Sequence, residues 1–168
     1  MRIIVNDANI LIDLLELQLL PQFFALEFEF FTTTLILEEL LDEQQLLLKP
    51  YLEQGILIAE EMTAIDLEAI KAIEKLKPKL SQQDCSAYHQ ARSKQGTLVT
   101  SDNVLRKFAL ATNIEVHGHL WVLDQMVEQQ TLTPLTASQK LTELCDNINT
   151  QLRLPKAECD QRHQVWNN

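Results

Sequence analysis

The sequence predicts an α/β domain with a mainly parallel central sheet and helices on both faces of that sheet. Short apolar and β-branched segments alternate along the chain with segments of helical periodicity, which is typical of parallel sheets joined by helices. No internal repeat, low-complexity linker or domain boundary interrupts this alternation. At 168 residues the chain is long enough to bury one sizeable core, so we expect a single domain.

The first half of the chain contains three predicted strands. The apolar run 3–5 predicts a buried strand, and apolar spacing over 8–19 predicts a helix that ends near Pro21. The aromatic and β-branched stretch FEFFTTT (28–34) predicts a second strand, followed by helical periodicity over 35–48. GILIAEE (55–61) predicts a short strand, and an amphipathic helix over 63–76 is stopped by Pro78.

The second half begins with a helix over 81–94 that opens on a capping-box pattern from Ser81 to Asp84. GTLVT (96–100) predicts a strand, 102–111 a helix, and 114–116 a last short strand. Residues 118–130 and 136–150 predict two closing helices. We therefore expect the domain to span 1–150 and residues 151–168 to form a polar C-terminal tail.

Rare residue types exclude several classes of protein. The three cysteines are odd in number and show no CxxC spacing, which argues against a disulfide framework and a zinc ribbon. With three glycines the chain has neither a GxGxxG fingerprint nor a P-loop, which excludes dinucleotide oxidoreductases and P-loop NTPases. No apolar run has the length of a membrane span and no signal-peptide pattern is present, so we expect a cytoplasmic protein without membrane contact.

The formal net charge of −10 restricts the choice of partner. A protein that binds nucleic acid by neutralising phosphates usually has a basic surface. Two explanations stay open: the partner is not a nucleic acid, or part of the acidity lies in a site whose charge a bound cation offsets.

Acidic residues occur where predicted strands give way to helices. Asp7 follows the first strand, Asp102 follows the strand 96–100, and Glu38 and Glu39 lie in the helix after FEFFTTT. Asp84 lies in the first turn of its helix. Because parallel strands end at one edge of a sheet, where ligands bind in such folds, we expect these carboxylates to converge.

Each acid also has a purely structural explanation. An aspartate near a helix N-terminus accepts backbone N–H bonds, so capping alone accounts for Asp7, Asp84 or Asp102 taken singly. Capping requires neither Asn9 after Asp7 nor Thr100 before Asp102, which weakens it for the set. Clustered carboxylates repel one another and a divalent cation relieves the repulsion. Donors that are all oxygens favour Mg²⁺ or Mn²⁺ over zinc.

Four motifs follow one another along these elements: NDAN, TTTLILEEL, LSQQDCSAYHQA and TSDNVLRKFA. In order and spacing they resemble the four-acid pattern of the PIN-domain family of metal-dependent ribonucleases, which includes the VapC-type toxins of toxin–antitoxin pairs. The resemblance covers about residues 1–130. It implies a PIN-like domain in which Asp7, Asp84 and Asp102 are catalytic residues that bind one or two Mg²⁺ or Mn²⁺ ions. It favours Glu39 over Glu38 as the remaining acid, because family members place this glutamate just before an apolar residue such as Leu40.

The resemblance implies cleavage of RNA phosphodiesters by metal-activated water. Asn9 and Thr100 are interpreted as groups that orient the acids, with turn and cap chemistry as an equal alternative. Four basic residues near the acidic motifs are candidate RNA contacts, although ordinary surface charge explains each one alone: Arg92, Lys94, Arg106 and Lys107.

Further hypotheses concern partners and competing functions. VapC-type proteins are dimers neutralised by a small antitoxin, so an antitoxin and a homodimer are candidate partners. The competing function is a non-catalytic PIN-like module that binds a protein, which the negative charge favours. A phosphohydrolase of the haloacid dehalogenase group needs DxD after the first strand, and the chain has Asp7-Ala8-Asn9, so this function is not favoured.

Two other patterns have structural explanations that involve no function. We interpret His117 and His119 as part of a turn and a helix cap, because zinc needs more nitrogen or sulfur ligands. The apolar stripe formed by Leu141, Leu144, Ile148 and Leu152 is expected to pack on its own domain, with a partner-binding surface as the alternative.

Overall fold

The computed structural model describes residues 1–168 and contains one five-stranded sheet in which all neighbouring strands are parallel. The spatial order is β3-β2-β1-β4-β5. The strands are β1 (Arg2–Asn6), β2 (Phe28–Thr33), β3 (Leu57–Glu60), β4 (Thr97–Val99) and β5 (Val116–His117). This arrangement confirms the predicted α/β fold with a parallel sheet.

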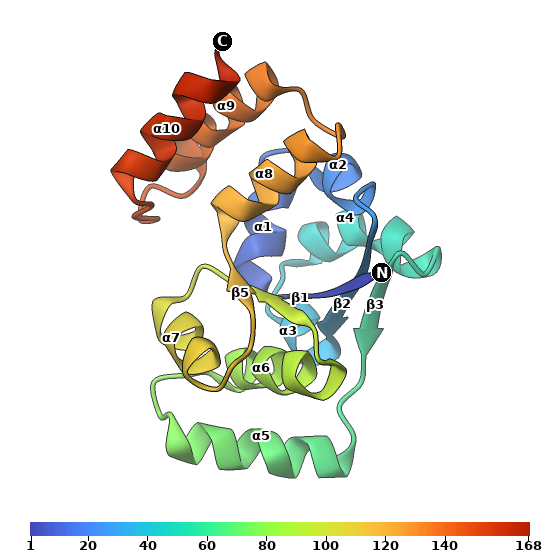
Figure 1. Ribbon diagram of the computed structural model, residues 1–168. Coiled ribbons are helices and arrows are strands. Elements are labelled where there is room, and N and C mark those ends of the chain that lie inside the picture. Colours follow the sequence, from blue (N-terminus) through green and yellow to red (C-terminus); the bar gives the residue numbers. More distant parts are fainter.

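Helices cover both faces of the sheet (Figure 1). One face is covered by α1 (Ala8–Glu16), α2 (Leu20–Phe24), α4 (Asp42–Glu53), α8 (His119–Glu128) and α9 (Pro134–Glu143). The other face is covered by α3 (Thr34–Glu38), α6 (Gln82–Lys94) and α7 (Asn103–Ala111), and α5 (Ala64–Leu76) packs on the outer side of α6. A π-helical turn, η1 (Leu144–Ile148), and helix α10 (Lys156–Trp166) end the chain. None of these helices is both long enough and apolar enough to span a membrane.

Side-chain alternation along the strands builds two hydrophobic cores. Ile4 and Phe30 point to the first core, whereas their neighbours Val5 and Phe31 point to the second. Successive side chains of a strand lie on opposite faces, so a strand buried on both faces must be apolar throughout. The apolar run that predicts β1 therefore supplies both cores at once.

The helix expected over 35–48 is two helices in the structure, α3 and α4. Leu41 between them is extended, with φ −66° and ψ 156°. The Gln45 side chain donates to the carbonyl oxygens of Leu37 and Leu40 at 2.9 and 3.0 Å, which satisfies the end of α3. Hydrophobic periodicity does not reveal this break, because apolar spacing continues across it.

The helix expected over 8–19 is also shorter than predicted. It ends at Glu16, and Gln18 adopts a positive φ of 60°. Pro21 then lies in the first turn of α2, where the absent N–H of proline leaves no helical hydrogen bond unmade. The proline therefore marks a new helix start, and it does not stop α1.

The C-terminal residues 151–168, expected as a polar tail, contain helix α10. This helix packs beside α9 (Figure 1), and Trp166 is buried in the first core. Arg162 of α10 donates two hydrogen bonds to Asp124 of α8, at 2.9 and 2.6 Å, and so links the two helices. Few apolar residues take part, so the sequence pattern gives little sign of this packing.

The apolar stripe near the C-terminus packs on its own domain. Leu141 and Leu144 are fully buried in the first core, and Ile148 and Leu152 are partly buried against it. The stripe is therefore occupied by the fold, as the simpler of the two explanations predicted.

Candidate active site

Asp7 lies at the carboxyl end of β1 and caps helix α1. Its Oδ1 atom accepts a 2.8 Å hydrogen bond from the Ala8 backbone N–H, which satisfies one of the unpaired donors at the helix start. Its Oδ2 atom accepts a 2.7 Å hydrogen bond from the Thr100 hydroxyl. The residue is 2% exposed. Asp7 is thus both a helix cap and a buried carboxylate that is tied to the end of β4.

The surroundings of Asp7 disfavour its negative charge. Burial raises the pKa of this carboxyl from 3.8 to about 6, although the Thr100 hydrogen bond opposes the shift. The charges of Asp84 and Glu39 raise the pKa further. Two carboxylates, from the start of α6 and the end of α3, therefore act on the buried Asp7.

Thr100 connects Asp7 with Asp102. Its hydroxyl donates to Asp7 and accepts a 3.1 Å hydrogen bond from the Asp102 backbone N–H. Thr100 is completely buried. The Asp102 carboxylate itself accepts from the Leu105 backbone N–H at 2.8 Å and caps α7. One hydroxyl thus positions two of the predicted acids, which supports an orienting role for Thr100.

Asp84 is held at the start of α6 by the predicted capping box, which the structure confirms. The Ser81 N–H donates to Asp84 Oδ2, and the Asp84 N–H donates to the Ser81 hydroxyl, both at 3.0 Å. Two residues further on, the Ser86 hydroxyl lies 2.8 Å from that of Thr33 at the end of β2. Thr33 also caps α3, so one contact holds the starts of α3 and α6 together.

Glu39 follows the last residue of α3. Partial desolvation of its carboxyl raises its pKa, and the charge of Asp84 raises it further. Glu39 is also the glutamate of this helix whose charge acts on Asp7. Both glutamates are exposed to solvent, so these couplings, and not burial, favour Glu39 over its neighbour Glu38.

The two asparagines around Asp7 differ in their surroundings. Asn9, expected to orient the acids, is exposed on α1, and its side chain forms no hydrogen bond. Asn6 is completely buried. Its side-chain amide donates to the Phe31 backbone carbonyl at 3.2 Å, and its backbone carbonyl accepts from the Thr32 hydroxyl at 3.1 Å. Asn6 therefore joins the ends of β1 and β2 beneath the acids. Asn6 was not among the predicted site residues. Its polar side chain at the end of the apolar run 3–5 is the sequence feature that could have indicated it.

The donor set suits a hydrated Mg²⁺ or Mn²⁺ ion. All of its donors are oxygens, which these cations prefer. In this arrangement no three acidic, histidine or cysteine side chains lie close enough together to hold an ion directly, because Asp84 and Asp102 are turned onto the helix starts that they cap. Mg²⁺ keeps several waters and needs only one or two protein carboxylates. The buried Asp7, under the charges of Asp84 and Glu39, fits such a partly hydrated ion.

The four basic candidates lie in different places. Arg106 lies against Gly118: a Cβ atom at that glycine would be 2.5 Å from Arg106 Nη1 and 3.5 Å from the Thr100 carbonyl oxygen. Lys107, the next residue of α7, is exposed. Arg92 lines a hollow with Thr97, at the amino end of β4 and thus the opposite end of that strand from Asp102. The structure therefore brings Arg106 to the acidic edge and leaves Arg92 away from it.

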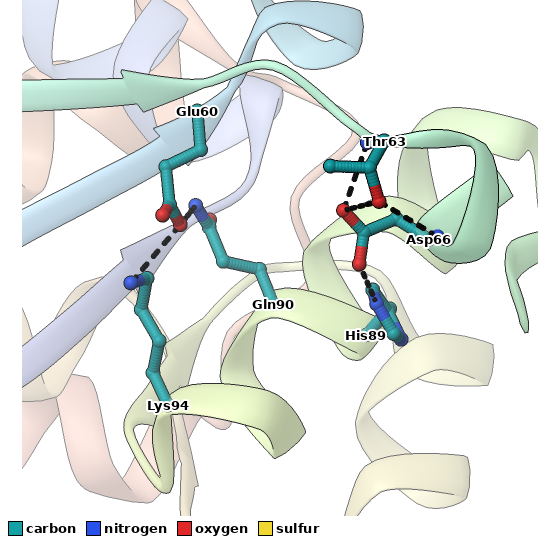
Figure 2. Close-up of polar contacts among 6 residues, drawn as sticks. All are labelled: Glu60, Thr63, Asp66, His89, Gln90 and Lys94. Atoms are coloured by element: carbon teal, nitrogen blue, oxygen red, sulfur yellow. Dashed lines mark hydrogen bonds and ion pairs between the residues drawn. The ribbon is translucent and has the colours of Figure 1, made fainter.

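Lys94 belongs to a second polar cluster, which Figure 2 shows. Its ammonium group lies 3.1 Å from Glu60 and 4.1 Å from the centre of the Phe31 ring. Gln90 donates to the same Glu60 carboxylate at 2.8 Å. These contacts explain Lys94 by interactions within the fold.

The second cluster continues at the start of α5, where Asp66 closes a capping box with Thr63. The other carboxylate oxygen of Asp66 lies 2.8 Å from His89 Nε2 on α6 (Figure 2). These hydrogen bonds, with the one to His89 as the largest cause, lower the pKa of Asp66 from 3.8 to about 2. This part of the cluster joins α5 to α6.

The two histidines around Gly118 point to different partners. The His117 ring stacks on Trp121, with ring centres 4.4 Å apart. His119 is buried, and its Nε2 atom lies 2.7 Å from Asp13 on α1. Gly118 is the N-cap of α8. The pair is therefore part of a turn and helix start, as predicted.

Fold and site together define a parallel α/β domain with a carboxylate-rich site at the carboxyl ends of its strands. A family model described as a PIN domain matches residues 3–168, so the chain belongs to the PIN-domain family. PIN domains are in general nucleases and generally use divalent metal ions. The match extends through α10, beyond the region that carries the four motifs. No curated protein matches the chain.

Proposed function

We propose that this PIN domain is an endoribonuclease that depends on Mg²⁺ or Mn²⁺. The observation that carries the proposal is the buried Asp7 carboxylate, on which the charges of Asp84 and Glu39 act. A structure that only needed a helix cap at this position would gain nothing from two further acids. Like charges gathered at a buried carboxylate are typical of a site that binds a cation or moves a proton.

Each acid has a separate proposed role. Asp7 is the central carboxylate, held in one orientation by Thr100 and by the start of α1. Glu39 and Asp84 supply charge from the end of α3 and the start of α6, and Asp102 is positioned through Thr100. One or two bound ions would lower the pKa of a water molecule and offset charge on the scissile phosphate.

The test is RNA cleavage by the purified protein with Mn²⁺, with and without EDTA. We expect Asp7→Asn and Asp102→Asn to lose cleavage. Glu39→Gln and Glu38→Gln form a matched pair, because both remove one charge from neighbouring positions of the same helix end. Loss of cleavage in the first and retention in the second is expected. Cleavage that persists unchanged in the Asp7 and Asp102 variants contradicts the site.

We also propose that the protein acts in the cytoplasm as the toxin of a toxin–antitoxin pair, as a homodimer that a small antitoxin protein neutralises. The resemblance of the four motifs to VapC-type toxins supports this role. Induced expression should arrest growth, and co-expression of the product of the neighbouring reading frame should relieve the arrest. Unimpaired growth on expression of a protein that cleaves RNA in vitro contradicts the toxin role alone.

The competing function is a non-catalytic PIN module that acts through protein binding. The net charge of −10 favours it, and so do the exposed apolar side chains of Leu46 and Leu47 on α4 and Ile58 on the edge strand β3. An edge strand with exposed apolar residues is suited to pairing with another chain. Calorimetry that shows no Mn²⁺ binding, together with a stable protein complex, would favour this function.

A further inference from the structure

A polar cleft of about 560 Å³ lies beside the proposed acidic site. Ser101 and Asn103, the neighbours of Asp102, line one side of it. The start of α8 lines a second side. The third side is formed by residues 151–162, which we name the C-terminal arm and which comprise the connection to α10 and its first two turns.

Arginines are concentrated in this cleft. The chain contains five arginines, and three of them line the cleft: Arg106, Arg153 and Arg162. Arg162 is neutralised by its two hydrogen bonds to Asp124. Arg106 and Arg153 form no ion pair. Two carboxylates also line the cleft: Asp124, which pairs with Arg162, and Glu158. The three arginines outnumber these two acids by one charge. In a chain of net charge −10, this local positive surplus with two unpaired guanidinium groups favours an anionic ligand.

The cleft comes closest to Thr100, which positions the acids, at Gly118. The absence of a side chain there lets the guanidinium group of Arg106 pack directly against the backbone, 2.5 Å from where a Cβ atom would lie. The same Cβ position is 3.5 Å from the carbonyl oxygen of Thr100, whose hydroxyl holds Asp7. An anion bound by Arg106 would therefore lie next to the residues that position the acids.

We propose that this cleft binds a phosphodiester group of the RNA strand, adjacent to the phosphate that is cleaved, with Arg106 and Arg153 as its ligands. The inference rests on the proposed nuclease function. An RNA strand bound at the acids would extend past Gly118, so its next phosphate would lie in the cleft. The planar guanidinium group matches two phosphate oxygens at once. The C-terminal arm thereby becomes part of the substrate-binding surface and more than a structural brace.

The test measures binding of a fluorescent single-stranded oligoribonucleotide to the full chain in EDTA, so that cleavage is not required. Arg153 is exposed, so its substitution should leave the fold intact. We expect Arg153→Gln to weaken binding about five- to tenfold. The salt dependence should also fall by about 0.7 in slope, as for one lost contact to a single strand. Arg153→Lys should recover part of the affinity. Lys71→Gln, which removes one charge from exposed α5, is the matched control and should bind as the wild type does.

The outcomes separate the cleft from the nuclease. Cleavage by the wild type, combined with unchanged binding by Arg153→Gln, overturns the cleft assignment and leaves the nuclease intact. Arg153-dependent binding without cleavage overturns the nuclease and supports the cleft. Equally strong competition by polyglutamate, or displacement of RNA by inorganic phosphate at low concentration, assigns the cleft to another anion and overturns the proposal.

Discussion

Two polar clusters lie where strands of the same sheet give way to helices, and they treat their carboxylates in opposite ways. At the end of β1, Asp7 is buried under the charges of Asp84 and Glu39, and its pKa rises to about 6. After β3, Asp66 is hydrogen-bonded to His89 and Thr63, and its pKa falls to about 2. Both residues belong to helix starts, so capping alone does not explain the difference.

The difference separates a stabilising cluster from a proposed functional one. Hydrogen bonds to the charged form of Asp66 lower the free energy of the native state wherever that carboxylate is ionised. Ionised Asp7 does the reverse, because burial and like charges raise the free energy of the native state. Natural proteins retain such unfavourable sites where function needs them, which is why Asp7 is the more informative residue to change.

The largest expected effect follows substitution of Asp7. Asp7→Asn should lower RNA cleavage by about 10² or more, because the central carboxylate of the site is lost. At pH 7 the same variant should be more stable than the wild type, by about 1–3 kcal/mol, because a buried charge is removed while the amide can still accept from Ala8. Cleavage assays and urea unfolding measure the two effects. A variant that is both inactive and less stable would mean that Asp7 is mainly a structural cap.

The second prediction concerns pH. Native Asp7 holds its proton up to pH about 6, whereas the unfolded chain releases it near 3.8. Between these values the native state binds more protons, so the Asp7 contribution to stability falls as pH rises, by about 3 kcal/mol at most. The wild type should lose stability relative to Asp7→Asn between pH 4 and 6, as measured by urea unfolding across this range.

Mn²⁺ provides the control for that pH effect. At pH 7 it should stabilise the wild type more than Asp7→Asn, because a cation offsets the charge that burial disfavours. A stability difference that is independent of pH would contradict the raised pKa. Equal stabilisation of both proteins by Mn²⁺ would place the bound ion elsewhere.

The third prediction concerns the cluster around Asp66, whose carboxylate is fully hydrogen-bonded to Thr63 and His89. Asp66→Ala should lower stability at pH 7 by about 1 kcal/mol, because α5 loses half of its capping box, and it should leave RNA cleavage unchanged. The folded pKa of Asp66 is depressed, so its contribution is present above pH 3.8 and is lost as pH falls towards 2. Thermal unfolding at several pH values measures this. The control is Thr63→Ser, which keeps the capping hydroxyl and should be as stable as the wild type. If Asp66→Ala loses RNA cleavage, the prediction is wrong and Asp66 contributes to the activity.

The sequence predicts the sheet well because the three central strands, β1, β2 and β4, supply both cores and are apolar at successive positions. Asp7 and Asp102 could be placed at the carboxyl edge for the same reason, since Asp7 directly follows β1 and Asp102 comes three residues after the end of β4. The parallel topology then brings them near each other through Thr100. Topology and local pattern agree in this part of the molecule.

Contacts between distant residues could not be predicted in this way. The Thr33–Ser86 contact joins residues that are 53 positions apart, and nothing in either local pattern marks it. Asn9 has the right spacing but faces solvent, because Ile10 and Leu11 take the buried positions of α1. The arrangement of α10 depends on the Arg162–Asp124 pair, which likewise has no periodic signal.

The smallest expected effect concerns the arginines of the cleft. Arg162 forms an ion pair with Asp124, whereas Arg106 forms none. Gly118→Ala should displace the Arg106 guanidinium group, since the new Cβ would lie 2.5 Å from its Nη1 atom. The end of a long side chain moves easily, and the φ of −123° at this position suits alanine, so stability should stay within about 0.5 kcal/mol of the wild type. RNA affinity in EDTA should nevertheless fall a few-fold, because the unpaired guanidinium group is the one that moves. If Gly118→Ala loses stability and keeps its affinity, the glycine is needed for packing of α7 against α8 and Arg106 does not contact RNA.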